Sequence, residues 1–311
     1  MPIKIMDGLS AKEKLHEEGI CTIDKGQALH QDIRPLHILI LNLMPLKKPT
    51  ELQLLRLLGD SPLQVEVDFC HTTSHKSTHT DSSYLEKNYY VFDEIKDNYY
   101  DGLIITGAPV EQIPFEEVDY WPEMTTYLDW ANTHAFSTLY FCWGAQAALY
   151  HYYGIAKRLL PAKLFGIFEY QLTQSHHPLL RGFDDRYFIP QSRHTAIDDI
   201  HVYNTPQLEI LSRSAENGIN IIGTPNHRRF FVLGHFEYDR RTLETEYLRD
   251  KNKGLPIAVP KHYYPNDNDT NTPVFTWCSY AHLFYHNWLN IVYQETPYNL
   301  ADIPALSVCA H

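Results

Sequence analysis

Short apolar runs alternate with amphipathic segments through the first half of the chain, and this alternation constrains the fold more than any other feature. His37–Leu43, Gly102–Thr106 and Thr138–Phe141 are largely apolar runs, typical of strands buried on both faces. Thr50–Gly59 and Phe115–Thr133 have the periodicity of helices and separate these runs. Strands that alternate with helices predict a parallel sheet covered on both faces. We therefore expect an α/β fold of three layers, with helices on both faces of the sheet.

The second half of the chain contains more strand patterns and fewer helical ones. The predicted strands are Leu164–Leu172, Tyr187–Pro190, Ile210–Arg213, Ile219–Ile222 and Phe230–Leu233, and the predicted helices are Arg240–Lys253 and Pro273–Gln294. No segment has the composition of a linker between domains. We expect a single, mostly parallel α/β domain over residues 35–297. An N-terminal arm or helix over residues 1–34 precedes it, and a tail over residues 298–311 follows.

Charge and hydropathy exclude several classes of protein. The 311 residues include 26 Lys and Arg against 38 Asp and Glu, so the net charge is 26 − 38 = −12, which argues against electrostatic binding of nucleic acid. No uncharged apolar run reaches the roughly 20 residues that a membrane helix needs. The first residues carry several charges and lack the apolar core of a signal peptide. We expect a cytoplasmic protein that binds neither membrane nor nucleic acid.

Cys142 is the cysteine whose surroundings suggest chemistry. The chain has five cysteines, an odd number without any CxxC pair, so a disulfide framework is not expected. Cys142 directly follows an apolar strand and precedes Trp143, Gly144 and an Ala-rich helix. A nucleophile on such a tight strand-to-helix turn is exposed above the sheet edge, and the helix N-terminus favours the thiolate.

A base for this nucleophile is found at the end of another predicted strand. His235 follows the apolar run Phe230–Leu233, and Glu237 lies two residues further on. In extended backbone these two side chains project to the same side, so the carboxylate can orient the imidazole. The pattern predicts a Cys142–His235–Glu237 triad at the carboxyl edge of the sheet.

With these residues the sequence resembles the homoserine O-acyltransferase family of methionine biosynthesis, which has a class I glutamine-amidotransferase-like fold. The resemblance extends from Met1 to Tyr298. The matching segments are Gln31–Leu36, Leu41–Pro45, Gln53–Gly59, Gly107–Glu111, Cys142–Ala147, Leu180–Asp184, Ser192–Thr195 and Asn287–Asn290.

The resemblance implies a ping-pong reaction without a bound cofactor, in a homodimer. Cys142 attacks an acyl-CoA and becomes acylated, and His235 then activates the hydroxyl of the acceptor. The amide of Trp143 is expected to stabilise the oxyanion, with a second donor from the Leu43–Lys47 loop. Lys47 is also a candidate for binding the CoA phosphates.

The resemblance also indicates the two substrates. Lys163, Ser192 and Arg249 match the family's acceptor-binding positions, and a guanidinium such as that of Arg249 suits an α-carboxylate. Glu111 stands where succinyl-transferring members have Gly. A carboxylate there repels the free carboxylate of succinyl-CoA, so acetyl-CoA is the expected co-substrate and L-homoserine the expected acceptor.

Departures from the family pattern leave alternatives open. Gln191, Phe236 and the segment Trp277–Tyr280 differ from many relatives and lie near the acceptor-site segments. L-Serine, one methylene shorter than L-homoserine, is therefore a second possible acceptor. A homoserine O-succinyltransferase, with succinyl-CoA as donor, is a separate alternative.

Three other functions are alternatives to this one: metal binding, glutaminase activity and binding without catalysis. His71, His75 and His79 are four residues apart, but the Thr- and Ser-rich segment is a poor helix, so we expect no metal site. A glutaminase would share the Cys-His-Glu scaffold, but Tyr140 stands where glutaminases have Gly. A non-catalytic binding module would not need an intact triad.

Overall fold

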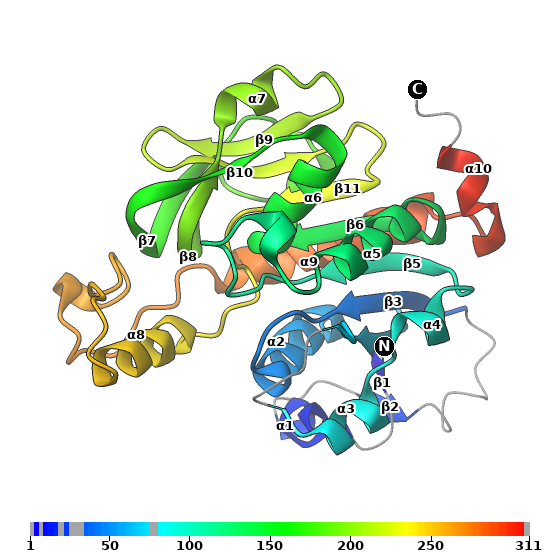
Figure 1. Cartoon of the computed structure of the whole chain (residues 1–311), viewed down its shortest axis with the longest axis horizontal. Helices are drawn as coiled ribbons and strands as arrows, with labels where there is room; N and C mark the ends of the chain where they lie inside the picture. Colours follow the sequence, from blue (N-terminus) through cyan, green and yellow to red (C-terminus); the bar gives the residue numbers. More distant parts are fainter. Residues whose placement is uncertain (1–2, 6–8, 18–21, 25–33, 75–79, 308–311) are drawn as a thin grey trace.

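One mixed sheet organises the computed structural model, which describes residues 3–5, 9–17, 22–24, 34–74 and 80–307 (Figure 1). Its strands in the described part lie in the order β2-β1-β4-β3-β5-β6-β11-β10-β9-β7-β8. Their bounds are β1 Ile3–Ile5, β2 Thr22–Asp24, β3 Leu36–Leu41, β4 Val65–Cys70, β5 Tyr100–Ile105, β6 Ala135–Phe141, β7 Lys157–Leu172, β8 Arg186–Ile197, β9 Glu209–Ser214, β10 Gly218–Gly223 and β11 Arg229–Val232.

Helices connect most of the parallel strands. The α-helices are α1 Ala11–Glu17, α2 Lys47–Gly59, α3 Ser82–Asn88, α4 Phe92–Ile95, α5 Trp121–His134, α6 Trp143–Tyr153, α7 Asp199–Tyr203, α8 Thr242–Asn252, α9 Cys278–Glu295 and α10 Ile303–Ser307. Short 3₁₀ turns occur at η2 Phe115–Glu117, η3 Pro178–Leu180, η4 Pro265–Asp267 and η5 Leu300–Asp302. Among the described residues, no helix combines the length and apolarity that crossing a bilayer requires.

The sheet has a parallel part and an antiparallel part. Strands from β2 to β11 in the spatial order run parallel, with β6 paired to both β5 and β11. Beyond β11, the strands β10, β9, β7 and β8 pair antiparallel. The expected α/β class with a mostly parallel sheet is therefore confirmed.

Both faces of the parallel part are buried, which explains its apolar strands. On β3, Ile38 and Ile40 point into one hydrophobic cluster, while Leu39 and Leu41 point into the other. The first cluster is completed by α1, α2 and α9, and the second by α5 and α6. Because a strand covered on both faces must be apolar at every position, its sequence does not alternate.

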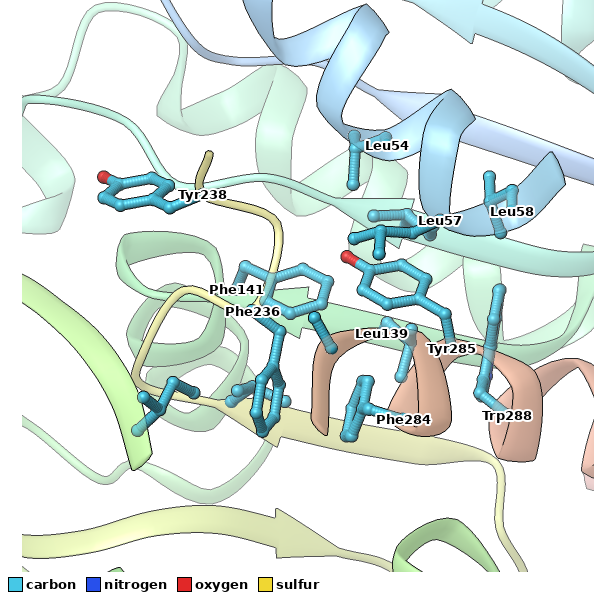
Figure 2. Close-up of a cluster of buried hydrophobic side chains, with 14 of the residues drawn as sticks. Leu54, Leu57, Leu58, Leu139, Phe141, Phe236, Tyr238, Phe284, Tyr285 and Trp288 are labelled. Atoms are coloured by element: carbon cyan, nitrogen blue, oxygen red, sulfur yellow. The ribbon is translucent and has the colours of Figure 1, made fainter. Parts of the chain in front are cut away.

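Aromatic residues of α9 fill the space between this helix, α2 and the sheet. Figure 2 labels the members of this cluster: Leu54, Leu57, Leu58, Leu139, Phe141, Phe236, Tyr238, Phe284, Tyr285 and Trp288. Gly102 of β5 permits the close approach of Trp288, because a Cβ at position 102 would lie 2.7 Å from the indole Cη2. The indole Nε1 of Trp288 donates to Ser137 Oγ at 3.2 Å, so its polar atom is satisfied.

The predicted strands and helices are present, but several boundaries were wrong. The predicted helix Phe115–Thr133 is divided into η2 and α5, because α5 begins at Trp121 with a proline in its first turn. The strand predicted at Tyr187–Pro190 extends to Ile197, and β7 begins at Lys157. The added residues pair with each other and include many polar side chains, so no apolar pattern predicts them.

Residues before position 35 also contribute to the sheet. Strands β1 and β2 pair in parallel beside β4, and α1 lies where a first helix was expected. The domain boundaries after residues 34 and 297 stay predictions.

Candidate active site

Cys142 lies at a sharp turn between β6 and α6. Its backbone has φ 47° and ψ −113°, a left-handed conformation that costs a residue with a side chain about 1–3 kcal/mol. Its amide donates to the carbonyl of Val232 at 2.8 Å, which ties the turn to the end of β11. Gly144 allows the helix to start so close to β5, since a Cβ there would lie 2.6 Å from the carbonyl oxygen of Thr106. These small and strained positions are those of a nucleophile elbow.

His235 reaches the same edge from the neighbouring strand. It is 2% exposed, and its amide donates to the carbonyl of Pro190 at 3.0 Å. Its Nδ1 lies 2.7 Å from Glu237 Oε1, so the carboxylate fixes the orientation of the ring. The other ring nitrogen, Nε2, is buried and makes no hydrogen bond within the described part of the chain. His235 lines the same cavity as Cys142.

The charges around His235 favour its protonated form. Burial lowers its pKa, but the negative charges of Glu237 and Cys142 outweigh burial and raise the pKa to about 10. The ring also stacks on Tyr238, with 4.1 Å between centroids. The imidazole of His235 is therefore held close to Cys142 in surroundings that stabilise its positive charge.

A cavity of about 240 Å³ opens above this pair. Six of the residues singled out in the sequence line it: Glu111, Cys142, Lys163, Ser192, His235 and Arg249. Glu237 lies behind His235 and is not part of the lining. The cavity is thus assembled from segments far apart in the chain, and Cys142 lies there at the carboxyl end of the parallel strand β6.

Charged and hydroxyl groups gather at one end of the cavity around a residue that the sequence did not single out, Glu246. Ser192 Oγ donates to its carboxylate at 2.8 Å, and Lys163 Nζ forms an ion pair with it. Arg249, on the same helix, binds Asp250 in a bidentate pair, with Nε–Oδ1 at 2.6 Å. The spacing of Glu246 and Arg249 places both on one face of α8, which is the signal that the sequence did offer.

Glu111 lies at another part of the cavity lining. Its Oε1 accepts the backbone N–H of His194 at 2.9 Å. Lys157 lies nearby, and burial lowers its pKa to about 8 although Glu111 and Glu116 act in the opposite direction. A negative charge is thus held at the wall of the cavity that also contains Cys142.

The expected oxyanion donors lie on two sides of the elbow. Trp143 is the first residue of α6, where an amide has no acceptor within the helix. In the Leu43–Lys47 loop, the amides of Leu43 and Met44 donate to Thr106 Oγ1 and Asn42 Oδ1. The second donor therefore stays a prediction.

Lys47 is buried and does not line the cavity. Its Nζ donates to the carbonyl of Asn42, and burial lowers its pKa to about 8. The proposed contact of Lys47 with CoA phosphates also stays a prediction.

The histidine trio considered for a metal is only partly described. His75 and His79 lie outside the described residues. His71 contacts the carbonyl oxygen of Thr72 through Nδ1 at 2.9 Å. The described ranges contain no group of three potential ligands.

Fold and site together define an α/β protein of the glutamine amidotransferase-like class, with a cysteine at the strand–helix elbow. A glutamine amidotransferase from Thermotoga maritima superposes with a TM-score of 0.54 at 11% identity, covering 85% of this chain and all of that one. A putative GMP synthase subunit from Thermoplasma acidophilum gives 0.52 at 14% identity, covering 84% and 96%. Such likeness shows the fold alone. Within this class, the model of the homoserine O-succinyltransferase family matches residues 2–298, and the chain belongs to that family.

Whole-length relatives support the same assignment. A protein named homoserine O-acetyltransferase from Desulfitobacterium hafniense is 52% identical over 97% of this chain and 99% of its own length. Proteins of the same name from Bacteroides fragilis and Acetivibrio thermocellus are 51% and 52% identical, over 97% of this chain and all of their own lengths. The resemblance drawn from the sequence is therefore confirmed.

Proposed function

We propose that the protein transfers an acetyl group from acetyl-CoA to the hydroxyl of L-homoserine. The observation that carries the proposal is the cavity in which Cys142 and His235 share a wall with Arg249 and Glu246. One part of this cavity offers a nucleophile with its base, and another offers charges of both signs for an amino acid. The relatives that match over their whole lengths are named for this reaction.

In the first half-reaction, Cys142 accepts the acetyl group. Its sulfur attacks the thioester carbonyl, and the thiol proton resides on His235. The tetrahedral oxyanion forms beside the amide of Trp143, and loss of one such donor typically costs about 10²–10³ in rate. The C–S bond to CoA then breaks, and the departing CoA sulfur takes the proton from His235. Glu237 holds the imidazole in place throughout.

In the second half-reaction, the acceptor hydroxyl attacks the acetyl-cysteine. His235 takes the hydroxyl proton, a C–O bond forms, and the bond from carbon to the Cys142 sulfur breaks. The guanidinium of Arg249 binds the α-carboxylate of the acceptor, and Glu246 binds its α-ammonium. Lys163 and Ser192 hold Glu246 in position through the contacts described above.

Glu111 selects the acyl donor in this proposal. Its carboxylate lines the cavity that holds Cys142, so a succinyl group would bring a second carboxylate to the same space. Like charges juxtaposed in a partly buried site cost several kcal/mol, which is enough to favour acetyl-CoA.

Three measurements test the proposal: acylation of Cys142, the comparison of homoserine with serine, and the comparison of acetyl-CoA with succinyl-CoA. Incubation with acetyl-CoA alone is expected to add one acetyl group to the peptide containing Cys142, as seen by mass spectrometry, and a Cys278→Ser control is expected to acylate normally. The ratio kcat/KM is expected to favour homoserine over serine by about 10- to 200-fold, the usual value of one methylene. An unmodified Cys142 would refute the mechanism, an equal or better use of serine would refute the acceptor, and a preference for succinyl-CoA would refute the donor.

We infer a cytoplasmic homodimer from the family resemblance alone. Sedimentation equilibrium of the purified chain tests the dimer, and cell fractionation tests the compartment. A single monomeric species would overturn the first inference, and recovery outside the cytoplasmic fraction would overturn the second.

A further inference from the structure

A second hollow lies at the opposite end of the strands that lead to Cys142 and His235. It has a volume of about 660 Å³, and a smaller one of about 220 Å³ adjoins it. Asn226, Arg228, Arg229 and Leu306 line both. The hollow lies where β6 and β11 begin, and Leu306 of α10 lines it. Helix α10 lies at the end of the molecule away from α8 (Figure 1). The length of β6 separates it from Cys142 by roughly 20 Å, so it is distinct from the active-site cavity.

Two adjacent arginines give this hollow its charge. Arg228 donates through Nη2 to the carbonyls of Asn132 at 2.9 Å and Ala135 at 3.1 Å, near the C-terminus of α5. Arg229 donates to Tyr153 Oη at 3.3 Å and to the Asn132 side chain. Across the residues that the structure describes, neither guanidinium forms an ion pair with a carboxylate.

The hydrogen bonds of Arg228 use only part of its guanidinium. Its Nε is buried and has no hydrogen-bond partner among the described residues. Burial and the neighbouring charge of Arg229 lower the pKa of Arg228 to about 10. The acidic residue on the rim, Glu295, already pairs with His227 at 2.8 Å. Two like charges are thus held together in a partly buried place, an arrangement that an anion would stabilise.

The remaining lining completes a site for an organic molecule. Phe136, Tyr153 and Leu306 supply apolar and aromatic surface, and Gln207 and Asn226 supply amide groups. Guanidinium forks recognise carboxylate and phosphate oxygens, which accept two parallel hydrogen bonds. We propose that this hollow binds a small organic oxyanion, whose carboxylate or phosphate pairs with Arg228 and Arg229 and whose apolar body lies against Tyr153 and Leu306. The proposal does not depend on the proposed acetyl transfer.

Thermal unfolding of the full chain tests the site with two probes. Inorganic phosphate and malonate are titrated separately, with sodium chloride held at constant ionic strength. At about ten times its dissociation constant, a bound probe is expected to raise Tm by about 2–4 °C. The probe with the larger shift identifies the headgroup, phosphate or carboxylate, that the site prefers.

Matched variants separate this site from others. Arg229→Gln is expected to abolish the shift. Arg213→Gln, which removes an exposed arginine on β9, and Arg249→Gln, which removes the cation of the active-site cavity, are expected to retain it. An equal shift in all three variants, or no shift in the unmodified protein, would overturn the proposal.

A second variant keeps the test valid if the first one fails to fold. If circular dichroism shows that Arg229→Gln is unfolded, Arg229→Lys takes its place. Lysine keeps the positive charge but lacks the paired N–H groups of the guanidinium. It is expected to weaken the apparent affinity for the better probe by about tenfold, the value of one charge-assisted hydrogen bond. Unchanged affinity in Arg229→Lys would contradict recognition by the guanidinium.

Discussion

At the scale of single residues, Glu246 shows how part of the cavity lining is assembled from segments far apart in the chain. Its partners Lys163 and Ser192 belong to β7 and β8, whereas Glu246 belongs to α8. The sequence singled out both partners through a family resemblance. The carboxylate that joins them was missed, because only the packing of α8 against the two strands brings the three together.

Replacing Glu246 by Gln tests its contact with the acceptor. The substitution keeps the shape but removes the charge that would bind an ammonium group, a contact worth about 1.5–3 kcal/mol. We expect KM for homoserine to rise about 10- to 100-fold, while the rate at which acetyl-CoA acylates Cys142 stays unchanged. Steady-state kinetics combined with single-turnover acylation measure the two effects. Glu244→Gln on the same helix is the control, and an equal loss in both half-reactions would argue for a structural role.

Replacing Glu111 by Gln tests the choice of acyl donor. The amide fills nearly the same space but no longer repels a second carboxylate. We expect the ratio of kcat/KM for succinyl-CoA to that for acetyl-CoA to rise at least about tenfold, measured with the two thioesters in parallel. Glu116→Gln serves as the control, because that carboxylate is bound by Tyr150 outside the cavity lining. An unchanged ratio would show that charge at position 111 does not select the donor.

At the scale of elements, the sequence predicts best where a strand is covered on both faces. Strands β3, β5 and β6 lie where apolar runs predicted them, because burial on both faces leaves an unbroken apolar signal. The extents of β7 and β8 were missed, since the added residues include many charged and polar side chains, and some of these, such as Gln191 and Arg193, are buried by pairing that the sequence does not show. The same distinction applies to the candidate site. Cys142 and His235 lie near the ends of strands that the sequence predicts, whereas the contacts around Glu246 could not be predicted from the sequence.

The contact between α9 and the sheet gives a prediction at this scale. A methyl group at position 102 would lie 2.7 Å from the ring of Trp288, so Gly102→Ala is expected to destabilise the fold by about 1–3 kcal/mol. Urea unfolding measures the loss. Combining Gly102→Ala with Trp288→Phe is expected to be less destabilising than the sum of the two single changes, because the smaller ring relieves the overlap. If the two losses of unfolding free energy simply add, the destabilisation by Gly102→Ala does not come from overlap with Trp288.

At the scale of the whole molecule, two buried histidines couple folding to pH in opposite directions. Burial, and to a lesser extent His227, lowers the pKa of His177 to about 4. The unfolded chain, with an ordinary value near 6.5, therefore binds this proton more readily than the folded chain. Stability from neutral His177 is lost as pH falls from about 6.5 to 4. The pKa of His235 is raised to about 10. Its contribution to the free energy of unfolding is therefore fully present below about pH 6.5 and is lost as the pH rises toward 10.

The acid side of this dependence can be tested through His177. Its Nδ1 accepts the amide of Leu179 at 3.2 Å, a contact that Asn can reproduce without titrating. We expect His177→Asn to reduce the loss of unfolding free energy between pH 6.5 and 4 by roughly 1–2 kcal/mol, after allowance for partial solvation. Chemical unfolding at a series of pH values measures it, with the exposed His201→Asn as control. If the free energy of unfolding depends on pH in the same way in the unmodified and His177→Asn proteins, His177 does not couple folding to pH.

The pairing of β6 with β11 has a consequence for how such an enzyme changes. Val232 lies opposite Phe141 in the ladder, so main-chain hydrogen bonds of the central sheet set the spacing between the thiol and the imidazole. Lys163 and Ser192 stand on the strands β7 and β8 at one edge of the sheet, and Glu246 stands on α8, all outside this central pairing. Substitutions on β7, β8 and α8 can therefore alter which acceptor fits the cavity, while the β6–β11 pairing keeps Cys142 and His235 in register.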